Sequence, residues 1–112
     1  MPQDRENTRY LVILTLGDAS PARLTSLVPS LTSLLKNLST EPIEQAFRAA
    51  AADVFGYFLR SKLPAQQLVA QIQSPNRTEP FLSNSDSLLV IEIGDDFAGF
   101  GRSRAWTWLQ RH

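Results

Sequence analysis

A chain of 112 residues is long enough for one domain with a single hydrophobic core, and its 43% hydrophobic and 20% charged residues are typical of a globular protein. Eleven basic residues balance eleven acidic ones, which argues against strong non-specific binding of nucleic acid. The chain has no cysteine and its single histidine is the last residue, His112, so disulfides and thiol nucleophiles are excluded and a histidine-based catalytic or metal centre is not expected.

The N-terminal part predicts a strand followed by a helix. RYLVILTL at 9–16 is a short apolar run typical of a buried strand, and the polar residues 1–8 before it are expected to form a disordered tail. Ser20 and Pro21 start a helix, because a serine hydroxyl caps free backbone N–H groups and proline fits the first helical position. Leucines then recur at three- and four-residue spacing, while Pro29 predicts a kink or two abutting helical pieces.

The segment EPIEQAFRAAAADV, residues 41–54, has two interpretations. The run of alanines favours a helix by propensity, whereas one face of a strand is the other interpretation, formed by Ile43, Gln45, Phe47, Ala49 and Ala51. The next stretch, VFGYFLRS at 54–61, is aromatic and typical of a strand, and its glycine indicates a bulge or a close backbone approach.

The C-terminal half predicts a second helix, a strand and a short last helix. Pro64 begins the helix PAQQLVAQIQ, and a polar loop at 74–86 leads to the strand SLLVIEI at 87–93. A terminal helix begins at Arg102 or Ser103.

This order of elements predicts the fold class. Two crossovers in so short a chain place both helices on one face of a four-stranded antiparallel sheet. We therefore expect an α+β domain at 9–112, a ferredoxin-like split βαβ (βαββαβ) sandwich with a short C-terminal helix. If 41–52 is helical, the alternative is a three-stranded α/β sheet.

The C-terminal third, SDSLLVIEIGDDFAGFG followed by AWTWLQ, resembles the end of small ferredoxin-like proteins grouped with the CRISPR-associated second-subunit nuclease superfamily, in particular its SinR-like branch. In that branch an acid-started apolar strand leads through a turn to a closing Trp-Leu helix. YFLRSKLPAQQLVAQI is similar to the third strand and second helix of the branch, and RYLVILTL matches its opening strand in character. The resemblance covers most of the chain loosely and 86–109 more specifically, and it implies a dimer of ferredoxin-like fold.

Nucleases of that superfamily carry an aspartate near the end of the first strand, paired across a dimer to hold magnesium. On this chain the position falls on Thr15, whose hydroxyl is a poorer ligand for a hard cation than a carboxylate. Asp18 lies three residues further on and takes that role only if the register slips. We therefore expect no metal or cofactor, with magnesium held by Asp18 and Glu92 as the alternative.

The acidic residues in and after the last strand could bind a metal, but a turn or a surface position explains each of them. Asp95 and Asp96 are adjacent, so in an extended chain they point apart, and we interpret them as a strand-ending turn. Glu92 shares a strand face with Leu88 and Val90. If the helices cover the other face, Glu92 stands on the open one, either as part of a partner surface or as a solvated acid at an edge.

A sheet with helices on one side leaves its other side to be covered. Because soluble monomers rarely expose a large apolar patch, we expect a homodimer formed about a two-fold axis. The terminal helix folding under the sheet is the alternative cover. Trp106 and Trp108 are two residues apart, so one helix side buries only one of them and the other is available for an interface. The apolar residues assigned to this side are Val12 and Leu14 or their alternates, Phe47, Tyr57 and Val90. The interface candidates are Phe47, Tyr57, Trp106 and Trp108.

Basic residues near aromatics are candidates for nucleic-acid binding, since guanidinium groups bind phosphate and aromatic rings stack on bases. The alternative for this group is a solvated helix face. The candidates are Arg60, Lys62, Arg102 and Arg104.

Together these features predict a non-catalytic homodimeric module, an accessory or regulatory protein of a prokaryotic nucleic-acid or defence system. The alternative within the same superfamily is a magnesium-dependent endonuclease, and a small-ligand sensor is a third class for which no specific residues stand out. No apolar run reaches the length of a membrane span, and the first residues are polar, so we expect a cytoplasmic protein with no membrane partner.

Overall fold

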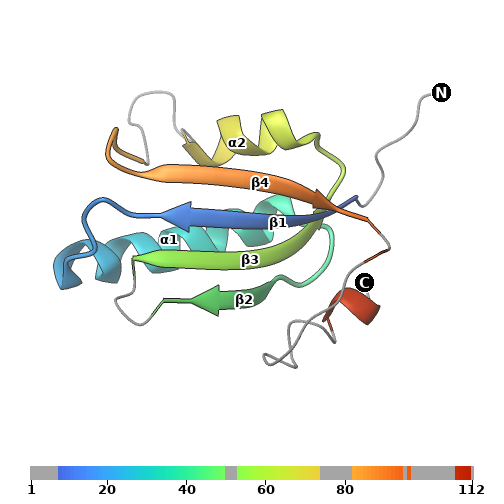
Figure 1. The fold of residues 1–112 in the computed structure, drawn as a ribbon, viewed down its shortest axis with the longest axis horizontal. Coiled ribbons are helices and arrows are strands. Elements are labelled where there is room, and N and C mark those ends of the chain that lie inside the picture. Colours follow the sequence, from blue (N-terminus) through green and yellow to red (C-terminus); the bar gives the residue numbers. More distant parts are fainter. Residues whose placement is uncertain (1–7, 50–52, 74–81, 95, 97–107, 112) are drawn as a thin grey trace.

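Strands and helices follow one another along the chain in the predicted order. The computed structural model describes residues 8–49, 53–73, 82–94, 96 and 108–111. The strands are β1 (Thr8–Thr15), β2 (Glu44–Arg48), β3 (Val54–Ser61) and β4 (Ser87–Ile93) (Figure 1). The helices are α1 (Pro21–Leu38) and α2 (Ala65–Gln73), and a short helical turn spans residues 108–111.

The described strands form one antiparallel sheet in the order β2-β3-β1-β4. β1 pairs with β3 on one side and with β4 on the other, and β2 pairs with β3. Each helix therefore connects two parallel strands that have another strand between them. This α+β arrangement is compatible with the predicted ferredoxin-like fold. The three-stranded alternative is wrong, because Glu44–Arg48 is a strand.

The boundaries of β3 and β4 are those predicted from the sequence. β1 begins one residue earlier than predicted, at Thr8, and the rest of the tail expected at 1–8 lies outside the described residues. The predicted start of the terminal helix, at Arg102 or Ser103, also lies outside them, but residues 108–111 are helical.

β2 contains a bulge opposite the glycine of β3. Gln45 pairs with Tyr57 and Phe47 pairs with Gly56, so two steps along β2 match one step along β3. The extra residue turns Phe47 onto the face opposite Gln45, and the prediction that both share one face is wrong. A Cβ added at Gly56 would overlap the Phe47 ring, so the glycine allows the ring to cross β3.

Helix α1 begins as its sequence predicts. Ser20 is the N-cap, its hydroxyl accepts the Arg23 backbone N–H at 3.4 Å, and Pro21 is the first helical residue. The helix continues through Pro29, so the prediction of two helical pieces is wrong. Pro29 is exposed, and so is Thr25, the residue whose carbonyl loses its helical donor to the proline. Neither α1 nor α2 is long and apolar enough to cross a membrane.

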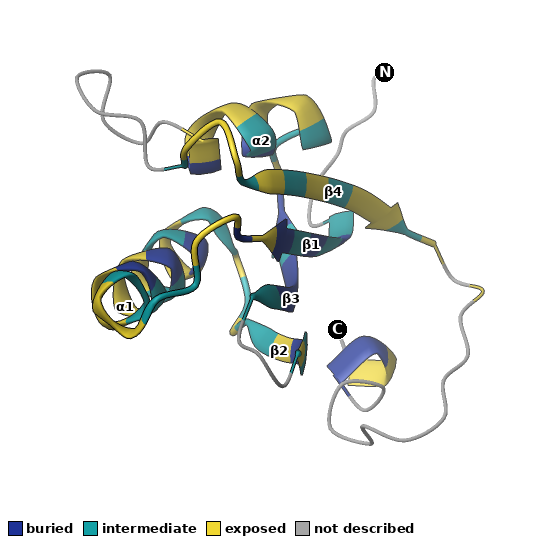
Figure 2. Ribbon diagram, turned by 60° about the vertical axis from the view of Figure 1, so that its left-hand side comes forward, coloured by how far each residue is buried: buried dark blue, intermediate teal, exposed yellow. Residues whose placement is uncertain are grey.

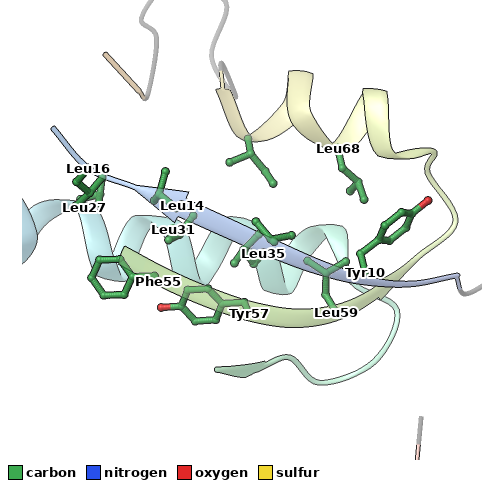
Figure 3. Close-up of a cluster of buried hydrophobic side chains, with 12 residues drawn as sticks. Tyr10, Leu14, Leu16, Leu27, Leu31, Leu35, Phe55, Tyr57, Leu59 and Leu68 are labelled. Carbon is green, nitrogen blue, oxygen red and sulfur yellow. The ribbon is translucent and has the colours of Figure 1, made fainter. Parts of the chain in front are cut away.

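The main core lies between the sheet and the two helices (Figure 3). Alternate residues of β1 and β3 point toward the helices. Tyr10 is fully buried there, and its hydroxyl donates to the Leu63 carbonyl at 2.8 Å, which satisfies the polar end of the ring. The buried members from the sheet and its end are Tyr10, Val12, Leu14, Leu16, Phe55, Tyr57 and Leu59, and those from the helices are Leu27, Leu31, Leu35, Leu68 and Ile72.

Candidate functional site

The face of the sheet opposite α1 and α2, which we call the open face, is partly covered by the C-terminal turn at 108–111 (Figure 2). Trp108 and Leu109 are buried there against Phe58 and Ala46, and none of the four is more than 5% exposed. The rings of Trp108 and Phe58 are stacked, with centroids 5.6 Å apart and 15° between their planes. The C-terminal turn therefore provides the alternative cover that the sequence allowed.

Hydrogen bonds fasten this turn to distant parts of the chain. The Trp108 indole N–H donates to the carbonyl of Pro42, just before β2, at 2.7 Å. The Arg9 guanidinium donates to the carbonyl of Leu109 at 2.9 Å and to that of Gly94, just after β4, at 2.7 Å. Arg9 thus joins the end of β4 to the C-terminal turn, a role that sequence reasoning missed. The one signal in the sequence is its position as a long cation beginning an otherwise apolar strand.

Away from this turn, apolar side chains of β1 and β4 remain on the open face. Leu89 is 54% exposed and Ile91 is 41% exposed, and among the described residues these are the large hydrophobic side chains with the greatest exposure. Ile13 of β1 is directly opposite Leu89 and is half-buried. We call Ile13, Leu89 and Ile91 the edge patch, because β4 is an outer strand of the sheet. Apolar side chains on an outer strand favour pairing of that strand with another chain.

The faces of β4 are the reverse of those predicted. Leu88 and Val90 are half-buried against the core under the helices, and Glu92 lies on the same side, opposite the buried Tyr10 of β1. The prediction that Glu92 stands on the open face is therefore wrong. Both faces of SLLVIEI are apolar, so alternation alone does not decide which face meets the helices.

Several apolar residues that were assigned from the sequence to the open face belong instead to the core under the helices. Val12 and Leu14 are 1% exposed, and Tyr57 is 5% exposed beneath the helices, so Tyr57 is wrong as a candidate for a surface contact. Phe47 does lie on the open face, where it is half-buried beside the cluster of Phe58 and Trp108. Trp108 itself is buried in the same chain, and Trp106 lies outside the described residues.

A second candidate region is the corner where β1 ends, near the start of α1. Thr15 is exposed at the end of β1, and Asp18 is exposed in the loop that follows. The Asp18 carboxylate accepts the backbone N–H of Ser20 at 3.0 Å, so it shapes the turn into α1. Asp86, which precedes β4, also lies at this corner. Its carboxylate accepts the backbone N–H of Gly17 at 2.9 Å.

Asp86 is the best-fixed acid of this corner. Its side chain is 0% exposed, and Arg23 of α1 donates to both of its oxygens, at 2.9 and 2.5 Å. The backbone N–H of Ser83 donates to it as well, at 2.8 Å. Hydrogen bonding from Arg23 holds the pKa of the Asp86 carboxyl well below its usual value, and the same bond raises the pKa of Arg23. The carboxylate is therefore fully engaged by donors, and sequence reasoning did not identify the pair.

The carboxylates of the described residues do not form a metal centre. No group of three or more Asp, Glu or His side chains in this part of the chain lies close enough to hold an ion. Asp18 follows the end of β1, whereas Glu92 pairs with Tyr10 near its start, so the two lie at opposite ends of one chain's sheet. Asp96 is exposed, and Asp95 lies outside the described residues.

The basic candidates are only partly placed by the structure. Arg60 is half-buried and directly opposite Arg9, which puts both cations at one end of the open face, and Lys62 is exposed just beyond β3. Arg102 and Arg104 lie outside the described residues. The open face thus offers Arg60 close to the C-terminal turn, while the guanidinium of Arg9 is bonded to carbonyls.

A shallow pocket of about 200 Å³ lies beside Asp86. Its volume is below the roughly 300–1,000 Å³ of most small-molecule sites, and it offers no charged group besides the engaged Asp86. The pocket therefore gives little support to a small-ligand sensor. It is lined by Val69, Gln73, Leu82, Ser83, Asp86 and Leu88.

No protein-family model, curated protein or solved structure matches this chain. The resemblance of its C-terminal third to the CRISPR-associated superfamily stays a prediction. The physical features available for a functional argument are thus the edge patch, the C-terminal turn that covers part of the open face, and the Arg23–Asp86 pair at the β1 corner.

Proposed function

We propose that this chain is a non-catalytic homodimeric module of ferredoxin-like fold, a cytoplasmic accessory or regulatory protein of a prokaryotic nucleic-acid or defence system. The strand order β2-β3-β1-β4, with both helices on one face, supports the fold. The system to which the module belongs is inferred from the resemblance of residues 86–109.

The β1 corner is the observation that carries the non-catalytic role. A nuclease of the resembled superfamily would hold magnesium with an aspartate near the end of its first strand, and this chain has Thr15 there. The acid with the most fixed position nearby, Asp86, accepts hydrogen bonds from Arg23, Gly17 and Ser83. A cation at that carboxylate would have to displace Arg23, and this supports a structural role for Asp86 in place of metal binding.

The edge patch supports the dimer. Leu89 and Ile91 lie on an outer strand and are exposed at 54% and 41%, which is costly in water for large aliphatic side chains. A contact between two copies would remove them from solvent without requiring any second surface.

A cleavage assay tests the proposal against the magnesium-dependent endonuclease. The protein is incubated with single-stranded RNA and with duplex DNA in the presence of Mg²⁺ or Mn²⁺, and we expect no cleavage above a protein-free control. Metal-dependent cleavage that is lost in Asp18→Asn would overturn the non-catalytic role, because Asp18 is the exposed acid of the β1 corner. Cleavage that persists in this variant and disappears on further purification would indicate a contaminating nuclease, whereas cleavage that copurifies with the protein would overturn the non-catalytic role.

The partner class is tested by gel retardation and sedimentation. Salt-dependent retardation of nucleic acid that is weakened in Arg60→Ala/Lys62→Ala or in Arg102→Ala/Arg104→Ala would establish nucleic acid as the partner. No retardation at low salt would favour a protein partner. We expect a dimer at micromolar concentration, and a monomer there would contradict the homodimer.

A further inference from the structure

The two outer strands of the sheet differ in how they discourage pairing with another chain. β2 has five residues, a bulge, and the charged residues Glu44 and Arg48, which are features that protect a sheet edge. β4 has seven residues in an unbroken register with β1 and contains no proline, lysine or arginine. Among the described residues no strand pairs with its outer side. β4 is therefore the edge that can accept another strand.

The side chains of β4 also favour a second strand beside it. Leu89 and Ile91, the exposed members of the edge patch, both belong to β4 and point to the open face. Leu88 and Val90 on the other face are only half-buried, although they pack against the core. A strand added to this edge would cover apolar side chains on both faces at once.

The low charge around β4 allows a copy of the same chain to be the occupant. A two-fold contact brings each surface against itself, so a charged surface would meet its own charge. Helix α2, which packs beside β4, contains no charged residue, and β4 contains Glu92 alone. The described residues of α2 and β4 thus carry little charge that would oppose a contact of this side with itself.

We infer that β4 pairs in antiparallel register with β4 of a second copy, about a two-fold axis at Val90, and joins two four-stranded sheets into one continuous sheet. This inference rests on the proposed homodimer and specifies its interface. In this register Leu89 lies opposite the partner's Ile91, and Leu88 lies opposite the partner's Glu92. The two copies of Glu92 are four residues apart along the strands, roughly 13 Å, so their repulsion is largely screened at physiological salt.

Charge swapping across the predicted pair tests the register. Leu89→Glu and Ile91→Lys, prepared as separate proteins, should each weaken the dimer by at least about tenfold, because a charge then faces an aliphatic side chain. Mixing the two proteins should restore a dimer, since Glu at position 89 then meets Lys at position 91 of the partner while the native Leu–Ile pair remains. Asn37→Lys, at an exposed position of α1, is the control and should dimerise as the wild type does.

Sedimentation velocity on each protein and on the mixture separates the outcomes. If both variants remain dimeric, the β4 contact is wrong while the proposed homodimer stands. If both are monomeric and mixing restores nothing, the register is wrong. A monomeric wild type overturns the homodimer and this inference together.

Hydrogen exchange on the wild type gives a second test that needs no variant. The amides of residues 87–93 that point away from β1 should be protected in the dimer and lose protection on dilution to monomer, whereas the alternate amides bonded to β1 stay protected. Protection of the outward-pointing amides that does not depend on concentration would contradict the contact.

Discussion

Arg23 and Asp86 are 63 residues apart in the chain, yet the guanidinium of one donates to both carboxylate oxygens of the other. The pair joins the first turn of α1 to the residue that precedes β4, and Gly17 adds the end of β1 through its N–H bond to the same carboxylate. Because the side chain of Asp86 is buried, the remaining donors around it depend on its carboxylate. This pair therefore attaches the start of α1 to the end of the sheet where β1 and β4 pair.

Replacing Asp86 by asparagine should destabilise the fold strongly. The substitution leaves Arg23 without its charge partner, and because the Arg23 side chain is 20% exposed, water replaces part of the lost bonding, so the loss should be about 1.5–3 kcal/mol. Urea unfolding followed by circular dichroism measures the change in the free energy of unfolding. Asp18→Asn is the matched control, because Asp18 is exposed and an asparagine can still accept the Ser20 N–H, so it should change stability by less than about 1 kcal/mol. Equal losses in the two variants would contradict the role given to the pair.

The same pair predicts how stability depends on pH. Because Arg23 lowers the pKa of Asp86 in the folded state, the unfolded chain takes up a proton on this group first as the pH falls. The stabilisation is complete above the ordinary carboxyl pKa of about 4 and decreases as the pH drops below it. The urea concentration at the unfolding midpoint of the wild type should therefore decrease as the pH is lowered from 5 to 2. The fall should be smaller in Asp86→Asn, and an unchanged slope in that variant would assign the acid sensitivity to other carboxylates.

Local sequence patterns predicted the helices and strands, whereas the arrangement of the candidate site depends on contacts between residues far apart in the chain. Ser20 and Pro21 specify the start of α1 through capping chemistry that acts within one turn, so the sequence alone was sufficient there. The facing of β4 was predicted wrongly because Leu89 and Ile91 are as apolar as Leu88 and Val90, and only the position of the helices distinguishes them.

The hydrogen bonds and the ion pair that join distant parts of the chain could not be predicted from local sequence patterns. Arg9 donates to the carbonyls of Leu109 and Gly94. Because every residue has a backbone carbonyl, the sequence does not indicate which carbonyls will be bound. The Arg23–Asp86 pair has the same difficulty, since nothing near either residue indicates the other. Gly56 indicated a bulge, but the sequence did not show that the extra residue lies in β2, opposite this glycine, where it places Phe47 on the open face.

Gly56→Ala should destabilise the protein through the neighbouring strand. An added Cβ overlaps the ring of Phe47, which must then move out of its place on the open face, at a cost of about 1–3 kcal/mol. Gly94→Ala is the control, because no atom lies within 4 Å of the Cβ it would add, and it should be close to neutral. In a Phe47→Leu background Gly56→Ala should cost clearly less, and urea unfolding of the four proteins of this cycle measures the difference. Equal costs in both backgrounds would show that the ring is not what excludes a side chain at position 56.

Removing the Trp108 side chain should uncover the open face. Trp108→Ala deletes the stack on Phe58 and the hydrogen bond to Pro42, and it should destabilise the protein by about 3–5 kcal/mol and increase the binding of a hydrophobic dye. Trp108→Phe keeps an aromatic ring but loses the indole donor, so it should cost about 1 kcal/mol with little change in dye binding. Gln110→Ala, at an exposed position of the same turn, is the control and should leave both measurements unchanged. If Trp108→Ala also leaves dye fluorescence unchanged, the C-terminal turn does not cover the open face in solution. In that case the surface that must be buried is larger than the edge patch, and the β4 contact alone would not account for it.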